Sequence, residues 1–388
     1  KEFHSDKHVT ITVIDKQNYS AYTPMLHEVA TGSVQADDIT HPIRQIVSCC
    51  LERFVKASVQ SIDLEQKIIK TDSGLVNYDY LVVALGSTNQ FFGVAGADEF
   101  ALTLKTMDDA IKLKRHIIDS FEAATKLAVD DIHRKHKLHT VIVGGGYTGV
   151  ETAGQLADLF NDEFKELYPE IQADEPKVTL VQGGKLILPI LSESSSIKAQ
   201  KRLEELGVEV LTGSRVNAVT KEGVSLDNGS ILESHNVIWA SGVLARGAEF
   251  FPEESLERGR VKTLSTLQME KHPNVFVIGD IAAIMHGSGP HPQTGQVAVQ
   301  QAEIVGENIK AYMTDQPLQP FLYKHKGDLV PIGDRWAIAE IGQVKLAGFI
   351  AWWMRRTVYL LGLSWSDRAR VVFTWTLNLF VKRDTTRL

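Results

Sequence analysis

The part of the sequence best suited to chemistry is a set of three glycines at G-x-G-x-x-G spacing, Gly144, Gly146 and Gly149. The apolar, β-branched run 140–143 before them predicts a buried strand, and the apolar periodicity of 149–168 predicts a helix. In this setting the first glycine makes a tight turn, the second lets the backbone approach a pyrophosphate, and the third lets helix and strand pack closely. The pyrophosphate would lie at the positive end of the helix. The stretch predicts a dinucleotide site, and the alternative is an empty turn of the same shape.

A second nucleotide-binding unit is indicated by Asp15. The run 9–14 predicts a strand that ends on this acid. A carboxylate at the tip of the second strand of a Rossmann unit accepts hydrogen bonds from the adenosine ribose. No glycine loop precedes it in the sequence, so we expect that fingerprint upstream of Lys1. The alternative is that Asp15 only forms a turn.

The elements that must position these residues alternate between strand and helix. Helices are expected to begin at residue 107 and at Thr294. A loop followed by a helix is expected at 18–32, and a polar linker of alternating charge at 130–137. Further strands are predicted at 80–84, 178–181, 237–240 and 274–278. This alternation predicts a parallel α/β architecture with two nucleotide domains, the second inserted in the first.

Composition argues against several classes of function. The net charge of −7 gives no general basis for nucleic-acid binding. Cys49 and Cys50 are the only cysteines, and because they are adjacent they provide neither a disulfide framework nor a spaced redox pair. The 13 histidines show no metal-ligand spacing, so no metal site is expected.

The C-terminal stretch 345–388 differs from the rest of the chain, with a net charge of +6 against −13 elsewhere. No charge-free run approaches the ~20 residues that a membrane span needs. We therefore expect an amphipathic helical tail that binds in the bilayer interface. The alternative is that its apolar stripe packs on the protein's own core or on a second subunit. Arg355 falls opposite this stripe, which comprises Leu346, Phe349, Ile350, Trp353, Leu360 and Leu361.

Several motifs in order resemble those of a known family. The two-dinucleotide-domain flavoproteins have motifs similar to GGGYTGVE (144–151), YLVVALGS (80–87), VIWASGV (237–243) and HPNVFVIGD (272–280) followed by a QVAVQQ helix (296–301). Within that group, NYSAYTPMLHEVATG (18–32) and GFIAWWMRRTVYLLGL (348–363) resemble the type II NADH dehydrogenases, which are single-chain NADH:quinone oxidoreductases. The resemblance covers nearly the whole chain and lacks only the N-terminal FAD fingerprint.

The resemblance implies roles for residues in the FAD-binding domain. Asp15 would hold the FAD ribose, Gly86 would lie near the flavin, and the Gly279–Asp280 pair would bind the ribitol and pyrophosphate region. The start of the helix at Thr294 would direct its positive end at the flavin pyrimidine.

The resemblance also implies how the substrates bind. Gly144, Gly146 and Gly149 would hold the NADH pyrophosphate, and Glu151 would lie by the nicotinamide carboxamide. Gln296 and Gln300 are four residues apart on one helix face, as expected if they flank the quinone head-group. The alternative for these two glutamines is a solvated helix face.

Gln182 departs from the usual pattern. It stands at the tip of the strand after the glycine loop, where an acid would bind the ribose 2′-hydroxyl of NADH and repel a 2′-phosphate. Neutral Gln182 does not repel that phosphate. We therefore expect NADPH to be accepted alongside NADH.

Together these features predict an FAD-dependent, non-proton-pumping NAD(P)H:quinone oxidoreductase of the respiratory chain. A hydride would pass from NADH to flavin N5, and two electrons would then pass to a quinone. The resemblance implies a homodimer bound peripherally at the cytoplasmic face of the cell membrane. Two alternatives are a soluble NAD(P)H-dependent flavoprotein reductase similar to ferredoxin reductases, and a flavoprotein that senses NADH.

The expected domain organisation follows the motifs. The FAD-binding domain would comprise 1–106 and 251–325, and the NAD(P)H-binding domain 107–250. Residues 326–388 would form the membrane-anchoring region.

Overall fold

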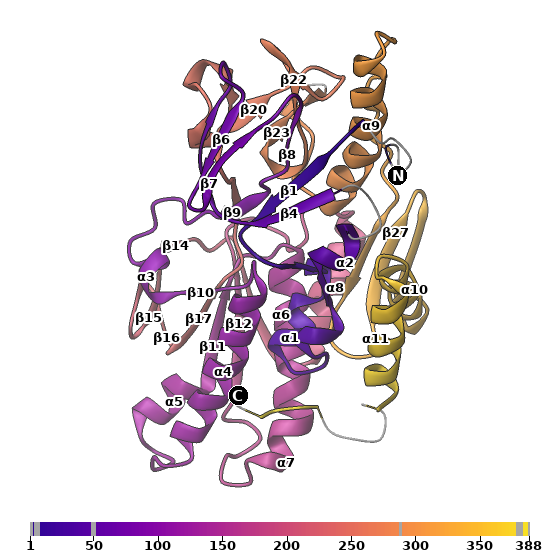
Figure 1. Cartoon of the computed structure of the whole chain (residues 1–388). Helices are drawn as coiled ribbons and strands as arrows, with labels where there is room; N and C mark the ends of the chain where they lie inside the picture. Colours follow the sequence, from indigo (N-terminus) through magenta and orange to yellow (C-terminus); the bar gives the residue numbers. More distant parts are fainter. Residues whose placement is uncertain (1–2, 4–7, 48–51, 287–288, 378–382, 387–388) are drawn as a thin grey trace. The chain divides into compact units, whose positions relative to one another are not determined.

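The computed structural model describes residues 3, 8–47, 52–286, 289–377 and 383–386 (Figure 1). Cys49 and Cys50 lie outside the described residues. The chain forms two compact units. Unit 1 is built from residues 1–20, 41–88 and 243–326, and unit 2 from 21–40, 89–242 and 327–388.

The centre of unit 2 is a five-stranded parallel sheet in the order β10, β17, β11, β12, β13. The predictions of strands at 140–143, 178–181 and 237–240 are confirmed. Because the strands are parallel, their carboxyl ends lie at one edge of the sheet, and the glycine loop follows β11 at that edge. The strands in sheet order are Leu102–Thr103, Asn236–Trp239, His139–Val143, Lys177–Gln182 and Val208–Thr212.

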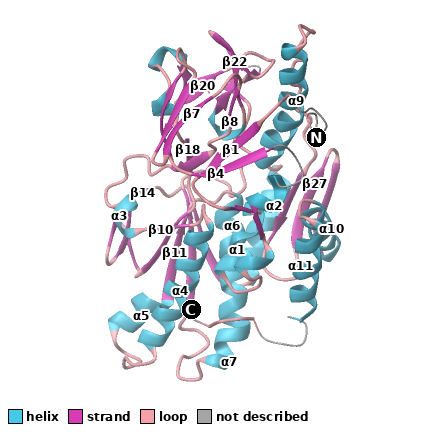
Figure 2. Cartoon of the chain, in the orientation of Figure 1, coloured by secondary structure: helices cyan, strands magenta, loops and turns pink. Residues whose placement is uncertain are grey.

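Helices pack on this sheet (Figure 2). Helix α6 (Tyr147–Leu159) contacts β11 and β12, and α1 (Leu26–Ala30) contacts α4 (Met107–Ala124) and α6. A π-helical turn and α7 (Lys165–Leu167) continue α6. The core is made of fully buried aliphatic side chains, among them Val141, Ile142, Val150, Leu156, Leu180 and Ile238.

The segment predicted as a polar linker is a helix, α5 (Ile132–Leu138). Asp131 caps it by accepting a hydrogen bond from the His133 N–H at 2.8 Å. Arg134 is buried, and its guanidinium donates to the two Glu175 carboxylate oxygens at 2.6 and 2.8 Å and to the Ala124 carbonyl at 3.1 Å. The linker prediction was wrong because it assumed that the charged side chains of 130–137 are solvated. The Arg134 guanidinium is instead buried and hydrogen-bonded inside the protein.

Two antiparallel sheets of unit 2 were not predicted. One contains β14 (Val216–Thr220), β15 (Gly223–Leu226) and β16 (Ile231–Glu233). The other contains β26 (Asp328–Pro331), β27 (Ala337–Ile341) and β28 (Val344–Gly348). Helix α10 (Phe349–Leu361) packs against the second sheet and contacts α11 (Trp365–Leu377).

The described residues of unit 1 contain three pairs of parallel strands, one of which is β20 (Arg260–Lys262) with β23 (Ala282–Ala283). Strand β1 (Ile11–Asp15) pairs with β4 (Glu52–Lys56), and β8 (Leu81–Val83) pairs with β22 (His272–Val277). The predicted strands 9–14, 80–84 and 274–278 are therefore present with slightly different ends. Antiparallel strands complete the unit: β5 (Val59–Asp63), β6 (Ile68–Thr71), β7 (Gly74–Asn77), β19 (Leu256–Glu257), β20 (Arg260–Lys262) and β21 (Gln268–Met269).

Helix α9 (Gly295–Met313) is the long helix of unit 1 and begins where predicted. Thr294 caps it by accepting a hydrogen bond from the Val297 N–H. Val297 and Val305 on its buried face pack in one cluster with Phe276 and Ile278, which anchors the helix beside the end of β22.

The predicted α/β architecture is confirmed, and residues 89–242 interrupt the sequence of unit 1. The borders between the units differ from those expected. Residues 21–40 belong to unit 2, the two central borders lie at 88/89 and 242/243, and 327–388 belong to unit 2 instead of standing apart. No helix among the described residues is long and apolar enough to span a membrane.

Candidate functional site

The glycine loop has the geometry that each predicted task requires. Gly144 has φ of +115°, and a Cβ there would lie 2.7 Å from the Ala240 carbonyl oxygen. A Cβ at Gly149 would lie 1.8 Å from the Gly144 carbonyl oxygen, so only glycine lets α6 approach the turn this closely. At Gly146 an added Cβ would meet nothing within 4 Å. The loop therefore leaves open space where a pyrophosphate would approach the backbone.

Gln182 ends β12 beside this loop, as expected from its position in the sequence. Its amide oxygen accepts a hydrogen bond from the Gly145 N–H at 3.0 Å, and its amide nitrogen donates to the Leu186 carbonyl at 3.2 Å. The side chain thus holds the glycine loop to the turn that follows β12 without placing a negative charge there.

Glu151 lies in a buried polar group of unit 2 that we call the Glu28–Arg355 cluster, comprising His27, Glu28, Glu151, Arg355 and Trp375. The Glu151 Oε2 atom lies 3.4 Å from His27 Nδ1. The Arg355 Nη2 atom lies 2.5 Å from Glu28 Oε1, and the Trp375 indole N–H donates to Glu28 Oε2 at 3.1 Å. The cluster thereby joins α1, α6, α10 and α11.

The contacts within this cluster determine which groups are charged. Arginine can only donate, so the 3.2 Å contact from Arg355 Nη2 makes His27 Nε2 the acceptor and places the ring hydrogen on Nδ1, facing Glu151. Burial, aided by the positive charge of Arg355, lowers the pKa of His27 to about 3. Burial raises the pKa of Glu151 to about 8, although Arg355 opposes this shift. At neutral pH His27 and Glu151 are therefore uncharged.

Glu28 and Arg355 form the ionic pair of the cluster. Burial is the largest single influence and opposes the charge of Glu28, but Arg355, His27 and the Trp375 hydrogen bond together outweigh it, so the pKa of Glu28 is lowered. Sequence reasoning missed Glu28, His27 and Arg355 as interacting residues. The only available signal was that the segments 18–32 and 348–363 carry family-like motifs.

In unit 1 the structure brings Gly86, Gly279 and Asp280 together. Strands β8 and β22 are parallel neighbours, so the residues that follow them meet at the same edge. The Ser87 hydroxyl donates to the Asp280 carboxylate, and the Gly279 N–H donates to the amide oxygen of buried Gln301 at 2.6 Å. Both glycines have positive φ, +69° at Gly86 and +75° at Gly279.

Asp15 lies at the end of β1 and is exposed. Its Oδ1 atom accepts a hydrogen bond from the Gln17 N–H at 2.7 Å, which stabilises the turn after the strand. Asp15 therefore makes the turn-forming contact that was the alternative to a ribose-binding role.

Gln296 and Gln300 lie on one face of α9, as their spacing predicts. Both bind the backbone of the segment that ends unit 1. Gln296 Oε1 accepts from the Lys326 N–H at 3.1 Å, and Gln300 exchanges hydrogen bonds of 2.9 and 3.0 Å with the Lys324 carbonyl and N–H. These side chains therefore hold 324–326 against α9, which neither the quinone prediction nor the solvated-face alternative described.

Replacement of Glu151 by glutamine is expected to remove a pH dependence of stability. The folded pKa of about 8 lies above that of an unfolded glutamate. The stabilisation from the bound proton is therefore complete below the unfolded pKa of about 4.3 and is lost as the pH rises through the folded value. The amide stays neutral at every pH. Between about pH 6 and about pH 9 the free energy of unfolding of Glu151→Gln should therefore rise by a few kcal/mol relative to that of the wild type.

Thermal unfolding at one scan rate, repeated across this pH range, measures the effect. Glu99→Gln, which changes an exposed glutamate of unit 2, is the control and should follow the wild-type profile. Parallel profiles for the wild type and Glu151→Gln would contradict the raised pKa.

Comparison with known proteins agrees with this geometry. A family model described as pyridine nucleotide-disulphide oxidoreductase matches residues 2–302. The type II NADH:quinone oxidoreductase of Staphylococcus saprophyticus is 32% identical over 357 residues, which cover 90% of this chain and 87% of the relative. The type II NADH:quinone oxidoreductase Ndh of Mycobacterium tuberculosis is 32% identical over 398 residues, with 97% and 84% covered.

Solved structures share the fold. The structure of NDH2 from Plasmodium falciparum in complex with NADH matches with a TM-score of 0.91 at 22% identity, covering 99% of this chain and 96% of that one. The sulfide:quinone oxidoreductase of Aquifex aeolicus matches with a TM-score of 0.73 at 17% identity, covering 98% and 91%. The resemblance inferred from the motifs is confirmed by the curated relatives. The chain belongs to the pyridine nucleotide-disulphide oxidoreductase family and, within it, to the type II NADH:quinone oxidoreductases.

Proposed function

We propose that this protein is an FAD-dependent, non-proton-pumping NAD(P)H:quinone oxidoreductase. The observation that carries the proposal is the glycine loop of unit 2, where Gly144 and Gly149 are required by the backbone and Gly146 faces open space. In a member of this family, such a loop is suited to the pyrophosphate of NADH. The adjacent pair Cys49–Cys50 lacks the spacing of a redox-active disulfide, which argues against a thiol-dependent reductase.

Unit 1 has features that suit a bound flavin. A Cβ added at Gly86 or at Gly295 would meet nothing within 4 Å, so there is open space after β8 and at the start of α9. We assign the flavin region to Gly86 and Gly279, the ribitol and pyrophosphate region to Asp280, and the ribose to Asp15. When bound, FAD supplies the chemistry, accepting a hydride from NADH and passing two electrons to a quinone.

The residues of the chain bind and orient the substrates. Gly144, Gly146 and Gly149 would bind the NADH pyrophosphate at the amino end of α6, and uncharged Glu151 would orient the nicotinamide carboxamide. Gln296 and Gln300 would act at the quinone site by holding the 324–326 backbone as one wall beside α9, which is the role their hydrogen bonds support.

The apolar faces of α10 and α11 support binding to a membrane surface. Several large apolar side chains there are solvent-exposed, including Trp353 at 61%, Leu361 at 66% and Trp365 at 83%. Among the described residues of unit 2, packing on the protein's own core leaves these three side chains mostly exposed. Such a cluster of aromatic and aliphatic side chains on helices too short to span a bilayer is typical of interfacial binding.

Charge contributes less to this binding than the net charge of the tail suggests. Arg355 is buried against Glu28, and the Arg356 guanidinium lies 4.1 Å from the Trp352 ring centre and 4.2 Å from that of Trp375. Burial of apolar side chains must therefore supply most of the affinity. On this basis we propose peripheral attachment at the cytoplasmic face of the cell membrane and, from the family resemblance, a homodimer.

The proposed reaction is tested by anaerobic spectroscopy. The purified protein in detergent should show a flavin absorption band, which one equivalent of NADH bleaches and a ubiquinone or menaquinone analogue restores. Bleaching without recovery on quinone would contradict the proposal and favour a soluble reductase or an NADH sensor. Recovery on ferredoxin but not on quinone would identify the former.

The neutral side chain of Gln182 predicts use of both nucleotides. The wild type should favour NADH over NADPH by less than about a thousandfold in kcat/KM, and Gln182→Glu should increase this preference about tenfold, because the new carboxylate repels the 2′-phosphate. Steady-state kinetics with both nucleotides measures the ratio. Gln172→Glu, at a turn outside the glycine loop, is the matched control. A larger wild-type preference would refute the prediction.

Membrane attachment is tested by flotation with vesicles that contain anionic lipid. Trp353→Asp combined with Leu361→Asp should reduce the vesicle-bound fraction at least tenfold, because each change places a charge on the apolar face. Leu75→Asp alters a similarly exposed leucine of β7 and should bind like the wild type. If the double variant binds vesicles normally but loses its dimeric state in sedimentation, the face is a subunit interface and the membrane proposal fails.

A further inference from the structure

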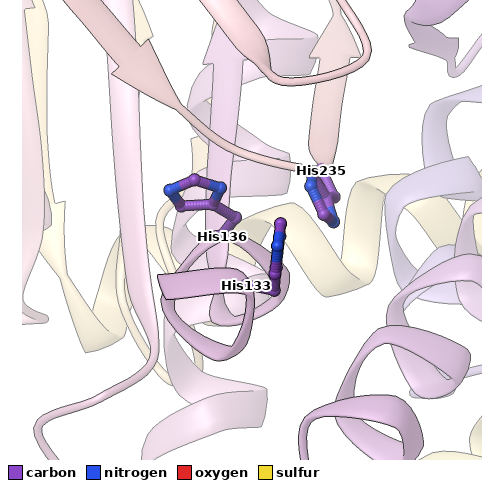
Figure 3. Close-up of side chains that lie close together, drawn as sticks. All are labelled: His133, His136 and His235. Carbon is purple, nitrogen blue, oxygen red and sulfur yellow. The ribbon is translucent and has the colours of Figure 1, made fainter. Parts of the chain in front are cut away.

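Three histidines of unit 2 lie close together, of which His133 is exposed, His235 half-buried and His136 buried. His133 and His136 come from α5, and His235 comes from the segment that leads into β17 (Figure 3). One ring nitrogen from each lies within 4.8 Å of those of the other two. A tetrahedral zinc ion with imidazole nitrogens at its usual bond length needs these atoms about 3.4 Å apart. Small side-chain rotations would therefore close the site, and exposed His133 is free to make the largest one.

The backbone around these histidines is held in place by hydrogen bonds. The His235 N–H donates to the His136 carbonyl at 2.9 Å, which fixes the segment before β17 to α5. Buried Asn236 donates to the Lys137 carbonyl at 2.7 Å and accepts from the Ser120 hydroxyl at 2.7 Å. Ligands on such a framework lose little conformational freedom when an ion binds, so the arrangement favours binding.

The surrounding charges suit an imidazole-bound cation. Glu233 Oε2 lies 3.1 Å from His136 Nε2. A carboxylate on one ring nitrogen fixes the tautomer and directs the other nitrogen to a metal, as the outer shell of many metal sites does. Lys137 and Glu222 both act electrostatically on His235, with opposite sign and with Lys137 the stronger, so Glu222 offsets only part of the positive charge there.

We propose that His133, His136 and His235 bind one divalent transition-metal ion of the zinc class. Imidazole ligands select zinc, copper or nickel over magnesium and calcium, and a water would complete a four-coordinate ion. In a linker, the spacing of the histidines in 130–137 would carry no metal-ligand pattern. On a helix, residues 133 and 136 are three apart and face the same side.

The position of the site indicates its role. His235 immediately precedes β17, whereas the glycine loop follows the carboxyl end of the neighbouring strand β11. Five residues of strand separate these two edges, which is about 16 Å. The ion would therefore take no part in electron transfer and would stabilise unit 2 by tying α5 to the central sheet.

The test measures zinc on the full-length holoenzyme, prepared without a polyhistidine tag and stripped with a chelator. Cys49→Ser/Cys50→Ser serves as the background, so that thiols do not contribute. Equilibrium dialysis followed by elemental analysis should find one Zn²⁺ per chain, retained in excess Mg²⁺. Zn²⁺ should also raise the melting temperature while leaving kcat for NADH oxidation unchanged.

Variants distinguish the site from other zinc binding. His133→Ala changes an exposed side chain, so it should fold normally, and it should weaken zinc binding at least tenfold and abolish the thermal shift. His235→Ala should have the same effects. The double variant His133→Ala/His235→Ala should bind zinc no more weakly than either single variant, because each change breaks the same site. His272→Ala, a histidine of unit 1, should behave as the background protein. Zinc bound equally by the background and His133→Ala, or not bound by either, would overturn the proposal.

Discussion

Unit 2 depends on the buried ion pair between Glu28 and Arg355. The two residues are 4% and 3% exposed, and removing two charges from water costs several kcal/mol for each. That cost is offset only when the charges meet at close range and their remaining groups are satisfied. The Trp375 indole and the His27 ring supply two such further contacts, whereas the buried Arg355 Nε has no hydrogen-bond partner among the described residues. Helices α1, α10 and α11 must therefore adopt one arrangement together, since a displaced partner would leave a buried charge alone.

This constraint connects the helix that follows the glycine loop with the apolar face of α10. Arg355 holds one side of α10 inward, so Trp353 and Leu361 on the same helix face outward. Through His27 the pair also lies next to Glu151 on the helix that follows the glycine loop. The nucleotide-binding helix and the apolar surface of the tail are thus attached to one rigid set of contacts within unit 2.

The parts of the fold that could be predicted from sequence are those whose signal is local. Strands β11, β12 and β17 are buried on both faces and read as continuous apolar runs, and the glycines after β11 have tasks defined by the backbone alone. The antiparallel strands β26 to β28 are of similar length but partly exposed, so they lack a continuous apolar run. Helix α5 was missed because the burial of Arg134 depends on Glu175, which lies far along the chain.

The same reason limits what could be predicted of the site. The position of Gln182 follows from counting along one nucleotide-binding motif, whereas no spacing relates His27 to Arg355 or His133 to His235. Their proximity is created by packing. The net charge of the tail was a true property of the sequence, yet it overstated the charge offered to a membrane because burial removes Arg355 from the surface.

The Glu28–Arg355 pair also has a consequence for how the protein is made. Arg355 is synthesised about 330 residues after Glu28, which takes roughly 15–65 s at ordinary translation rates. During that interval α1 has no partner for its carboxylate and cannot be buried in its final place. The nucleotide-binding unit is therefore completed only after α10 has been synthesised. Because α10 and α11 are made one after the other, a chain that stops before α10 would carry neither a finished binding unit nor the apolar surface proposed to bind a membrane.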